Sequence, residues 1–469
     1  MALLLNSCGQ KPQSTAANSL PEPPRVVDCE PGIPGGRLIL GMPGNPRTFN
    51  PVLESDSASD AVVRLMFSPL VEVDMESQEA KPGLAESWSV GRDQKTWTFK
   101  LRKNLKWSDG APLTADDVVF TWNDVMYNPK YNPATYGLFR SGGKNFEVTK
   151  VDDLTVRVVT PGVFAPFLEY FGSVVILPKH NLESMVANGQ FTNAYAVTDP
   201  PEKIVGSGPY RLKVFKPQQG VILTRNPEYW SVDKKGQRLP YFDEVQLDIA
   251  MTPAALVSLF FQGQSEAFEN IRPEEAWEFH QLSTNRHVNL IDLGVGVQRD
   301  FLWFNENTGV GKNGKPFVDP VKLKWFRDKR FRQAISCAID RDRMIREVYN
   351  GRAQAVYGFL ASDNKKWNNP AITEYKYDPA RAKALLAELG MTNHGSDGML
   401  LDAGGHPVEF SLLASRENPM RKNIALRLED DLKQVGIRLD YEPVDFLSML
   451  RQINGSMDYE SASMGFGGG

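Results

Sequence analysis

Residues 83–120 read GLAESWSVGRDQKTWTFKLRKNLKWSDGAPLTADDVVF and contain several structural signals in quick succession. In the middle of this stretch Trp97, Phe99 and Leu101 alternate with polar residues. Such period-two alternation is typical of a β-strand with one buried face. The stretch therefore predicts a strand that packs large aromatic side chains into a core.

A turn and a helix are predicted directly after this strand. The Asp109-Gly110 pair favours a tight turn, because glycine accepts backbone angles that other residues avoid. Thr114 then lies three residues before Asp117, just ahead of an apolar run. A threonine hydroxyl and an acid at this spacing can cap a first helical turn reciprocally, so a helix is expected from about residue 115.

Bulk composition is that of a large globular protein. The chain has 469 residues, too many for one hydrophobic core, so about two or three packed units are expected. Hydrophobic residues make up 41% and charged residues 23%, and the formal net charge is −4. This balance offers no basic face of the kind that nucleic acid requires. No run of ~18 apolar residues is present, so no membrane-spanning helix is expected.

The three cysteines do not form the pattern of a disulfide framework, and Cys8 instead suggests attachment of the chain to a lipid. Cys337 lies in an apolar helical repeat and is expected in a core, whereas Cys29 lies in a segment without periodicity. The residues Leu3–Cys8 (LLLNSC) resemble the end of a bacterial lipoprotein signal, although the apolar run is short. Cys8 is therefore expected to carry a lipid anchor, the alternative being a chance cysteine. Residues 10–36, rich in Pro, Gly, Ser and Gln, predict a flexible tether.

Apolar patterns beyond residue 36 indicate alternating strands and helices. Strands are expected to begin near residues 37, 155, 210, 221 and 245, followed by a helix at 253–262. A separate α/β unit is expected from about residue 270. Its elements are a strand at 301–305, helices at 328–349, 379–389 and 419–435, and a strand at 437–441.

Six segments resemble one protein family in the family's own order. They are Gly83–Trp88, Trp97–Phe120, Val205–Leu212, Asn226–Trp230, Pro316–Gly351 and Ile424–Phe466. The chain resembles a family 5 extracellular solute-binding protein, the oligopeptide- and dipeptide-binding type that serves ABC importers. The resemblance extends from about residue 37 to the end.

The resemblance implies an α/β, two-lobed periplasmic-binding-protein-like fold (class II type) with an extra subdomain on lobe one. After the signal remnant and tether at 1–36, lobe one would comprise 37–55 and 181–269, and the subdomain 56–180. Residues 270–469 would form lobe two. Members of the family have further residues after the position of Gly467-Gly468-Gly469. The resemblance therefore implies that the C-terminal segment that leads the chain back into lobe one is missing.

No catalytic, metal or nucleotide motif competes with this interpretation. The sequence lacks Gly-x-Ser-x-Gly, His-Glu-x-x-His and Cys-x-x-Cys, and its histidines are scattered. The loop 309–315 matches most of a phosphate-binding loop, but Pro316 stands where a hydroxyl is needed. No cofactor and no metal are therefore expected. A cleft hydrolase with paired carboxylates remains the hypothesis from another functional class.

Ligand contacts follow from the resemblance alone. The strand at 301–305 should turn one set of side chains to the core and the other to the ligand. For Trp303, burial in the core is the alternative. The residues implied as ligand contacts are Thr48, Phe49, Tyr136, Phe301, Trp303, Asn305, Met420, Ser463 and Phe466.

Two positions depart from the pattern of peptide binders. Ser463 stands where an arginine can hold the ligand carboxylate, and glycines follow Phe466 where an aspartate can hold the ligand amino group. A buried ammonium without an acid is costly, which weakens the case for a free peptide N-terminus.

The resulting expectation is a monomeric, lipid-anchored substrate-binding protein in the periplasm or at the cell surface. It would capture oligopeptides in an inter-lobe cleft, without catalysis, and deliver them to an ABC permease and ATPase complex. A non-peptide solute, such as an oligosaccharide, an opine or a metal chelate, is the alternative within this class. A sensor that presents its ligand to a membrane receptor is a further alternative.

Overall fold

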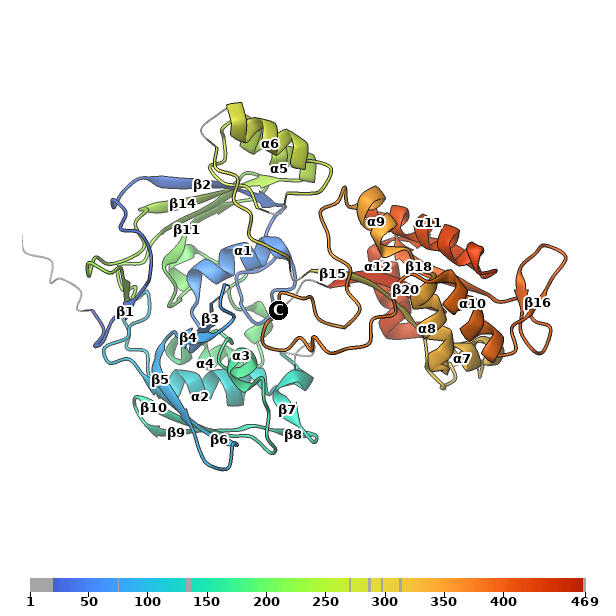
Figure 1. Cartoon of the computed structure of the whole chain (residues 1–469). Helices are drawn as coiled ribbons and strands as arrows, with labels where there is room; N and C mark the ends of the chain where they lie inside the picture. Colours follow the sequence, from blue (N-terminus) through green and yellow to red (C-terminus); the bar gives the residue numbers. More distant parts are fainter. Residues whose placement is uncertain are drawn as a thin grey trace, which may run out of the picture. The chain divides into compact units, whose positions relative to one another are not determined.

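The computed structural model describes residues 20–466, apart from residues 75, 132–135, 270, 286–287, 297 and 312–313. The chain divides into two compact units, Met1–Glu269 and Asn270–Gly469. In Figure 1 each unit combines strands with covering helices, the α/β architecture expected from the sequence. Cys8 lies outside the described residues.

The central sheet of unit 1 has the strand order β11-β12-β14-β2. Its strands are β2 (Arg37–Pro43), β11 (Tyr210–Lys216), β12 (Gly220–Arg225) and β14 (Glu244–Ala250). β14 and β2 run parallel, whereas β12 is antiparallel to both of its neighbours. Val221, Leu223 and Leu247 are buried at alternate positions, as the period-two pattern predicts. Helix α1 (Ser57–Met66) packs into the same hydrophobic core.

A second, antiparallel sheet in unit 1 contains the strands from the stretch at residues 83–120. Its order is β5-β6-β10-β9, formed by β5 (Ala85–Val90), β6 (Thr96–Leu101), β9 (Glu147–Asp152) and β10 (Thr155–Val159). In β6, Phe99 and Leu101 are fully buried while Lys100 is exposed. The predicted strand with one buried face is confirmed.

The capped helix after this strand is also confirmed. Helix α2 (Ala115–Phe120) begins after Thr114, whose hydroxyl accepts the amide hydrogen of Asp116, while the Asp117 carboxylate accepts from the Thr114 amide at 2.9 Å. The helix continues as a π-helical segment, Thr121–Met126. There Trp122 stacks on Phe171 with ring centroids 4.0 Å apart, and both rings are buried.

Residues 20–36, within the expected tether, lie along unit 1. Strand β1 (Arg25–Val26) pairs in parallel with β13 (Ser231–Val232). The Arg25 and Arg102 guanidinium carbons lie 5.8 and 5.6 Å from the ring centroid of buried Trp230. Backbone pairing and cation–π contacts do not require an apolar repeat in the sequence. The packing of residues 20–36 on unit 1 was therefore not visible in their composition or periodicity.

Unit 2 is built on a single larger sheet of order β15-β20-β18-β19. Its strands are β15 (Arg299–Phe304), β18 (Glu409–Ser415), β19 (Arg438–Val444) and β20 (Ser461–Phe466). β18 runs parallel to β19 and β20, and β15 is antiparallel to β20. The main core of this unit brings the sheet together with α7 (Pro320–Arg327), α8 (Lys329–Ala338), α10 (Pro379–Glu388) and α11 (Pro419–Gln434). A smaller core on the other face includes α12 (Phe446–Arg451).

The single helix expected at 328–349 is wrong, because two helices, α8 and α9 (Arg341–Val348), occupy that range. The chain leaves the helical conformation at Ile339, and the Asp340 carboxylate then accepts the Arg343 amide hydrogen at 2.8 Å as the cap of α9. An aspartate inside an apolar repeat can thus end one helix and start the next. Cys337 is buried in the core of α8, as expected.

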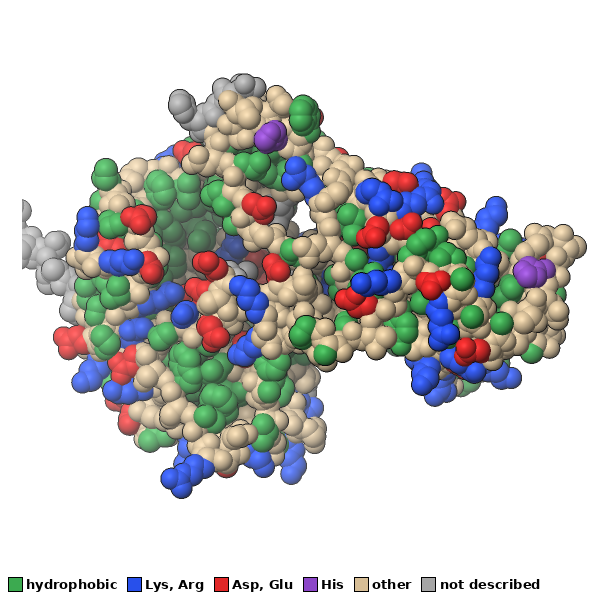
Figure 2. All heavy atoms as spheres, viewed as in Figure 1, with side chains coloured by type: hydrophobic (Ala, Val, Ile, Leu, Met, Phe, Trp, Pro, Cys, Tyr) green, Lys and Arg blue, Asp and Glu red, His purple; other side chains and the backbone are tan. Residues whose placement is uncertain are grey.

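The remaining elements are short. In unit 1 they are β3 (Val71–Val73), β4 (Ala80–Pro82), β7 (Arg140–Ser141), β8 (Lys144–Asn145), α3 (Phe167–Phe171), α4 (Lys179–Ala187) and α5 (Pro253–Phe261). In unit 2 they are α6 (Ala276–Asn285), β16 (Asn393–His394) and β17 (Leu400–Leu401). Within the described ranges no helix is long and apolar enough to cross a membrane. Figure 2 shows acidic and basic side chains interspersed on the visible face of both units.

Candidate ligand-binding site

Strand β15 lies at an edge of the unit 2 sheet and has two different faces. Leu302 and Phe304 pack against the main core, where Phe304 stacks on Phe326 with centroids 4.8 Å apart. Trp303 belongs to the smaller core on the opposite face. Every residue of β15 remains partly exposed, and none of the described strands pairs with its outer edge. An edge strand of this kind presents backbone donors and acceptors outward.

Aromatic rings follow one another along the face of β15 that carries Trp303. The Phe301 ring centroid lies 5.5 Å from that of Trp303 and 6.5 Å from that of Phe359. At the other end, the Trp303 indole nitrogen donates to the Tyr459 hydroxyl at 3.2 Å. We call Phe301, Trp303, Phe359 and Tyr459 the aromatic row. Its rings are half-buried or exposed, so the row can stack against a bound molecule.

A pocket of about 670 Å³ borders β15 and lies wholly within unit 2. Its walls come from β15, α8, α9, the segment 349–361 and the first turns of α11. The sequence-predicted residues that the structure brings together in its lining are Phe301, Trp303, Met420 and Ser463. A space of this volume is in the range of pockets that hold small molecules.

An ion pair lies beneath the pocket between β15 and α11. The Arg421 and Asp300 side chains approach to 2.6 Å and are only 9% and 15% exposed. The Tyr349 hydroxyl also donates to the Asp300 carboxylate. Burial, followed by the charge of Asp300, raises the pKa of Tyr349, so this hydroxyl keeps its proton. A Cβ added at Gly465 would overlap the ends of the Arg421 and Asp300 side chains, so a larger residue there would force this ion pair to shift.

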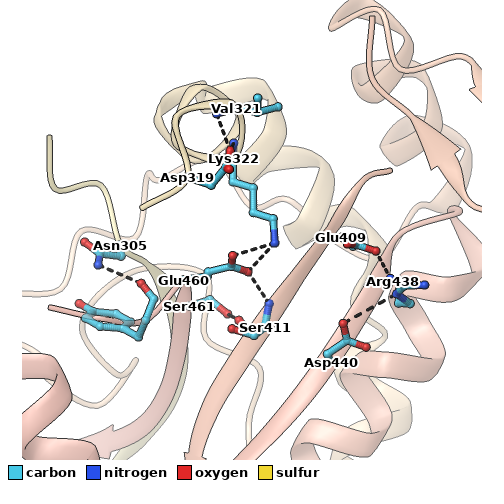
Figure 3. Close-up of polar contacts among 11 residues, drawn as sticks. Asn305, Asp319, Val321, Lys322, Glu409, Ser411, Arg438, Asp440, Glu460 and Ser461 are labelled. Carbon is cyan, nitrogen blue, oxygen red and sulfur yellow. Dashed lines mark hydrogen bonds and ion pairs between the residues drawn. The ribbon is translucent and has the colours of Figure 1, made fainter. Parts of the chain in front are cut away.

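Asn305 serves the scaffold of unit 2 rather than the pocket. Its amide nitrogen donates to the backbone carbonyls of Met457 and Tyr459, each at 2.9 Å, and the residue is 3% exposed. Figure 3 shows this contact beside Glu460, whose carboxylate accepts from the Lys322 ammonium and from the Ser411 amide at 2.8 Å. These bonds fix the start of β20 against β15 and β18, and thereby the position of Tyr459.

Of the unit 1 residues implied by the resemblance, Thr48 and Phe49 make their contacts within unit 1. Phe49 is fully buried and packs edge-on against Phe215 at 5.8 Å, so in this structure it belongs to the core. The Thr48 hydroxyl accepts the Asn50 amide hydrogen at 3.0 Å. Tyr136 begins a 3-10 helix, Tyr136–Phe139. In unit 2, Phe466 is the last residue of β20, opposite Arg299.

The sequence did not predict Phe359 and Tyr459 of the aromatic row, nor the lining arginines Arg299, Arg341 and Arg352. Tyr459 reaches Trp303 only because β20 pairs with β15 in one particular register, with Trp303 opposite Ala462. Phe359 comes from a segment without regular structure. No spacing rule could have found either residue, although exposed aromatics near an expected ligand strand are a usable signal.

The lining of this site suits noncovalent recognition. Among the described residues, no group of three or more His, Cys, Asp or Glu side chains could hold a metal ion. The lining combines aromatic and aliphatic walls with arginine side chains, including Arg299, Arg341 and Arg352. Such a mixture suits a ligand that carries both apolar groups and hydrogen-bond acceptors.

Comparisons with known proteins place this geometry in context. The family model described as "Bacterial extracellular solute-binding proteins, family 5 Middle" matches residues 79–469. A probable ABC transporter-binding protein of Deinococcus radiodurans is 27% identical over 438 residues, which cover 90% of this chain and 72% of that protein. The oligopeptide-binding protein AppA of Bacillus subtilis is 27% identical over 474 residues, covering 99% and 78%.

The chain is also similar to a solved structure of a peptide complex and to a relative named for a carbohydrate ligand. The structure of Bacillus subtilis AppA in complex with a nonapeptide matches with a TM-score of 0.68 and 26% identity, covering 93% of this chain and 80% of that chain. The periplasmic alpha-galactoside-binding protein of Rhizobium meliloti is 26% identical over 395 residues, covering 81% of this chain and 56% of that protein.

Proposed function

Because this chain belongs to the bacterial extracellular solute-binding proteins of family 5, we propose that it captures oligopeptides for an ABC importer. The likeness to the AppA structure confirms the two-lobed periplasmic-binding-protein-like fold. AppA itself was solved with a nonapeptide, and its similarity covers nearly the whole of this chain and about four fifths of AppA. Members of this family are solute-binding proteins, and catalysis forms no part of the proposed function.

The observation that carries the proposal is the edge strand β15 beside a pocket of about 670 Å³. An extended peptide can add to such an edge through backbone hydrogen bonds, while pockets receive its side chains. Backbone pairing is indifferent to peptide sequence, so it gives the tolerance that an importer of mixed peptides needs. The aromatic row would cover alternate side chains of the bound peptide.

A thermal-shift titration tests the proposal, because a ligand that binds only the native state raises the melting temperature. A mixed pool of tri- to pentapeptides should raise it, and Trp303→Leu should weaken that response. Trp367→Leu is the matched control, since Trp367 is 42% exposed and lies outside the pocket lining. Absence of any shift with peptides, in a protein that shifts with sugars or metal chelates, would refute the peptide assignment.

A carbohydrate ligand is the second candidate, and the aromatic row is the observation that favours it. Flat rings such as Trp303 and Phe301 can pack against the apolar faces of sugars, and an alpha-galactoside-binding protein is among the relatives. Raffinose-type oligosaccharides should then quench Trp303 fluorescence and shift the melting temperature. A response to tetrapeptides alone would remove this candidate.

Members of this family are extracellular or periplasmic binding proteins. For this chain we further propose a lipid anchor at Cys8, a monomeric state, and delivery to an ABC permease and ATPase complex. The Leu3–Cys8 pattern supports the anchor. Palmitate labelling that is lost in Cys8→Ser would support it, and labelling that persists in this variant would contradict it. Light scattering of the purified protein reports the oligomeric state.

The lobe assignment is likewise a proposal. We infer that residues 37–55 with 181–269 form lobe one, that 56–180 form its subdomain, and that 270–469 form lobe two. The two separate sheets of unit 1 support the division between lobe one and the subdomain. Limited proteolysis should release fragments that end near residue 270, and early cleavage within 56–180 would contradict the assignment.

A further inference from the structure

The pocket of unit 2 carries an excess of positive charge. Two acidic side chains line it, and both are already paired: Asp300 with Arg421 at 2.6 Å and Glu306 with Arg332 at 3.1 Å. The same lining contains Arg299, Arg341 and Arg352. Within the part of the chain that the structure describes, none of these three guanidinium groups has a carboxylate at ion-pair distance.

Arg341 is the most deeply placed of the three arginines. It donates to the Ser336 carbonyl and hydroxyl oxygens, both at 2.9 Å, and its guanidinium carbon lies 4.8 Å from the ring centroid of Tyr357. These are neutral partners, so they orient the group without cancelling its charge. Burial lowers the pKa of Arg341, which expresses the cost of keeping an uncompensated cation away from water.

Arg299, the first residue of β15, likewise lacks a carboxylate partner among the described residues. Its guanidinium carbon lies 4.5 Å from the ring centroid of Phe359, and its buried Nε has no acceptor among the described residues. Arg352 follows in the exposed segment after α9. Three arginines from β15, α9 and the segment after it therefore line one pocket. A buried charge without a partner is unfavourable, and an anionic ligand group would supply the missing partner.

Apolar side chains also belong to the lining of this pocket. They are Ile339, Met344, Ile345, Ile424 and Leu428. A small inorganic anion would leave these walls without contacts, whereas an anionic group on a larger, partly apolar ligand would satisfy both kinds of surface.

We propose that this pocket selects peptides that present a carboxylate to Arg341, Arg299 and Arg352. The inference rests on the proposed peptide-binding function and specifies its ligand class. The shared chemistry is a carboxylate, which can come from a peptide C-terminus or from a Glu or Asp side chain. Charge-assisted hydrogen bonds from guanidinium groups are short and directional, so a single carboxylate can engage more than one arginine.

Calorimetric titration of the full chain with matched tetrapeptides tests the inference. One peptide carries a central Glu and an amidated C-terminus, a second a central Gln and a free C-terminus, and a third a central Gln and an amidated C-terminus. At least one of the two anionic peptides should bind about tenfold to a hundredfold more tightly than the neutral third. The tighter of these two identifies the source of the carboxylate.

Variants connect the preference to the pocket. Arg341→Met and the exposed Arg352→Gln should each reduce the anionic preference severalfold, whereas Arg346→Gln should leave it unchanged. Arg346 lies in the same helix α9 but is exposed and outside the lining, so it matches the charge change. Arg352→Gln keeps the test valid if Arg341→Met fails to fold.

The failures are distinguishable. Equal binding of all three peptides overturns the charge selection and leaves the proposed function intact. A preference that survives both pocket variants, with only a lower melting temperature in Arg341→Met, assigns these arginines a structural role and also overturns the inference. No binding of any peptide overturns the proposed function together with the inference.

Discussion

Removing one partner of the Arg421–Asp300 ion pair should destabilise unit 2 at least as much as removing both. The two groups approach to 2.6 Å, and each is no more than 15% exposed. In Arg421→Met the Asp300 carboxylate keeps only the Tyr349 hydroxyl as a strong partner, and in Asp300→Asn the guanidinium of Arg421 is left with a neutral amide. Either change therefore leaves a charge buried without compensation.

The magnitude follows from the burial of the pair. Two unit charges about 4 Å apart interact with about 4 kcal/mol at the effective dielectric constant near a protein surface. Breaking a buried pair by removing one member costs about 3–5 kcal/mol, whereas replacing both members is often nearly neutral. We expect about 3 kcal/mol for each single variant and no more than about 3 kcal/mol for the double variant. The coupling free energy should therefore be at least about 3 kcal/mol.

The assay must report on unit 2 alone, because a chain with two units need not unfold in one step. Native-state hydrogen exchange of the β15 and β20 amides measures the local opening free energy in wild type, both single variants and the double variant. Costs that add in the double variant would refute the reasoning, since they would mean that the two charges do not interact. Gly465→Ala should mimic the single variants, because its side chain would clash with the pair.

Three further predictions concern local structure. Thr114→Ala should cost about 1 kcal/mol in urea unfolding of unit 1, whereas Thr114→Ser should cost much less; equal losses would argue against the capping box. Trp122→Ala should cost about 3–5 kcal/mol, since it removes a fully buried ring, and a loss below about 1 kcal/mol would contradict that packing. The side-chain hydrogen bond from Arg330 lowers the pKa of Asp328 to about 2. The ionised Asp328 carboxylate therefore stabilises the fold above about pH 4 and loses that contribution as the pH falls toward 2. In an NMR titration, Arg330→Gln should raise the titration midpoint of Asp328. An unchanged midpoint would refute the hydrogen bond from Arg330 as the cause of the shift.

Local elements were predictable where one short-range rule dominates. The alternation of Trp97, Phe99 and Leu101 and the Thr114–Asp117 spacing each specify a structure within a few residues, and both occur as expected. The break between α8 and α9 was missed because Asp340 acts as a cap inside an apolar repeat that reads as one helix. The packing of residues 20–36 was missed because strand pairing with β13 depends on residues about 200 positions away.

The site was predictable only in part, for a similar reason. Phe301, Trp303, Met420 and Ser463, which the family resemblance implies as ligand contacts, meet in one pocket lining. Their contact with a ligand stays a prediction. Asn305 shares a strand face with Trp303 by spacing, yet its amide is committed to the backbone of residues 457 and 459. The aromatic partner Tyr459 and the unpaired arginines depend on how β15, β20, α9 and α11 come together. Spacing along a chain specifies faces of elements, but partners across elements come from the assembled fold.

Hydrogen–deuterium exchange of residues 299–304, with and without a saturating tetrapeptide, shows whether a bound peptide occupies the edge of β15. We expect slower exchange of β15 amides in the peptide complex, because an extended ligand would take up the open edge of this strand. The exchange of β5 and β6 in unit 1 should remain unchanged. Peptide binding that protects no amide of β15 would contradict the proposed site, and no binding of any peptide would contradict the proposed function itself.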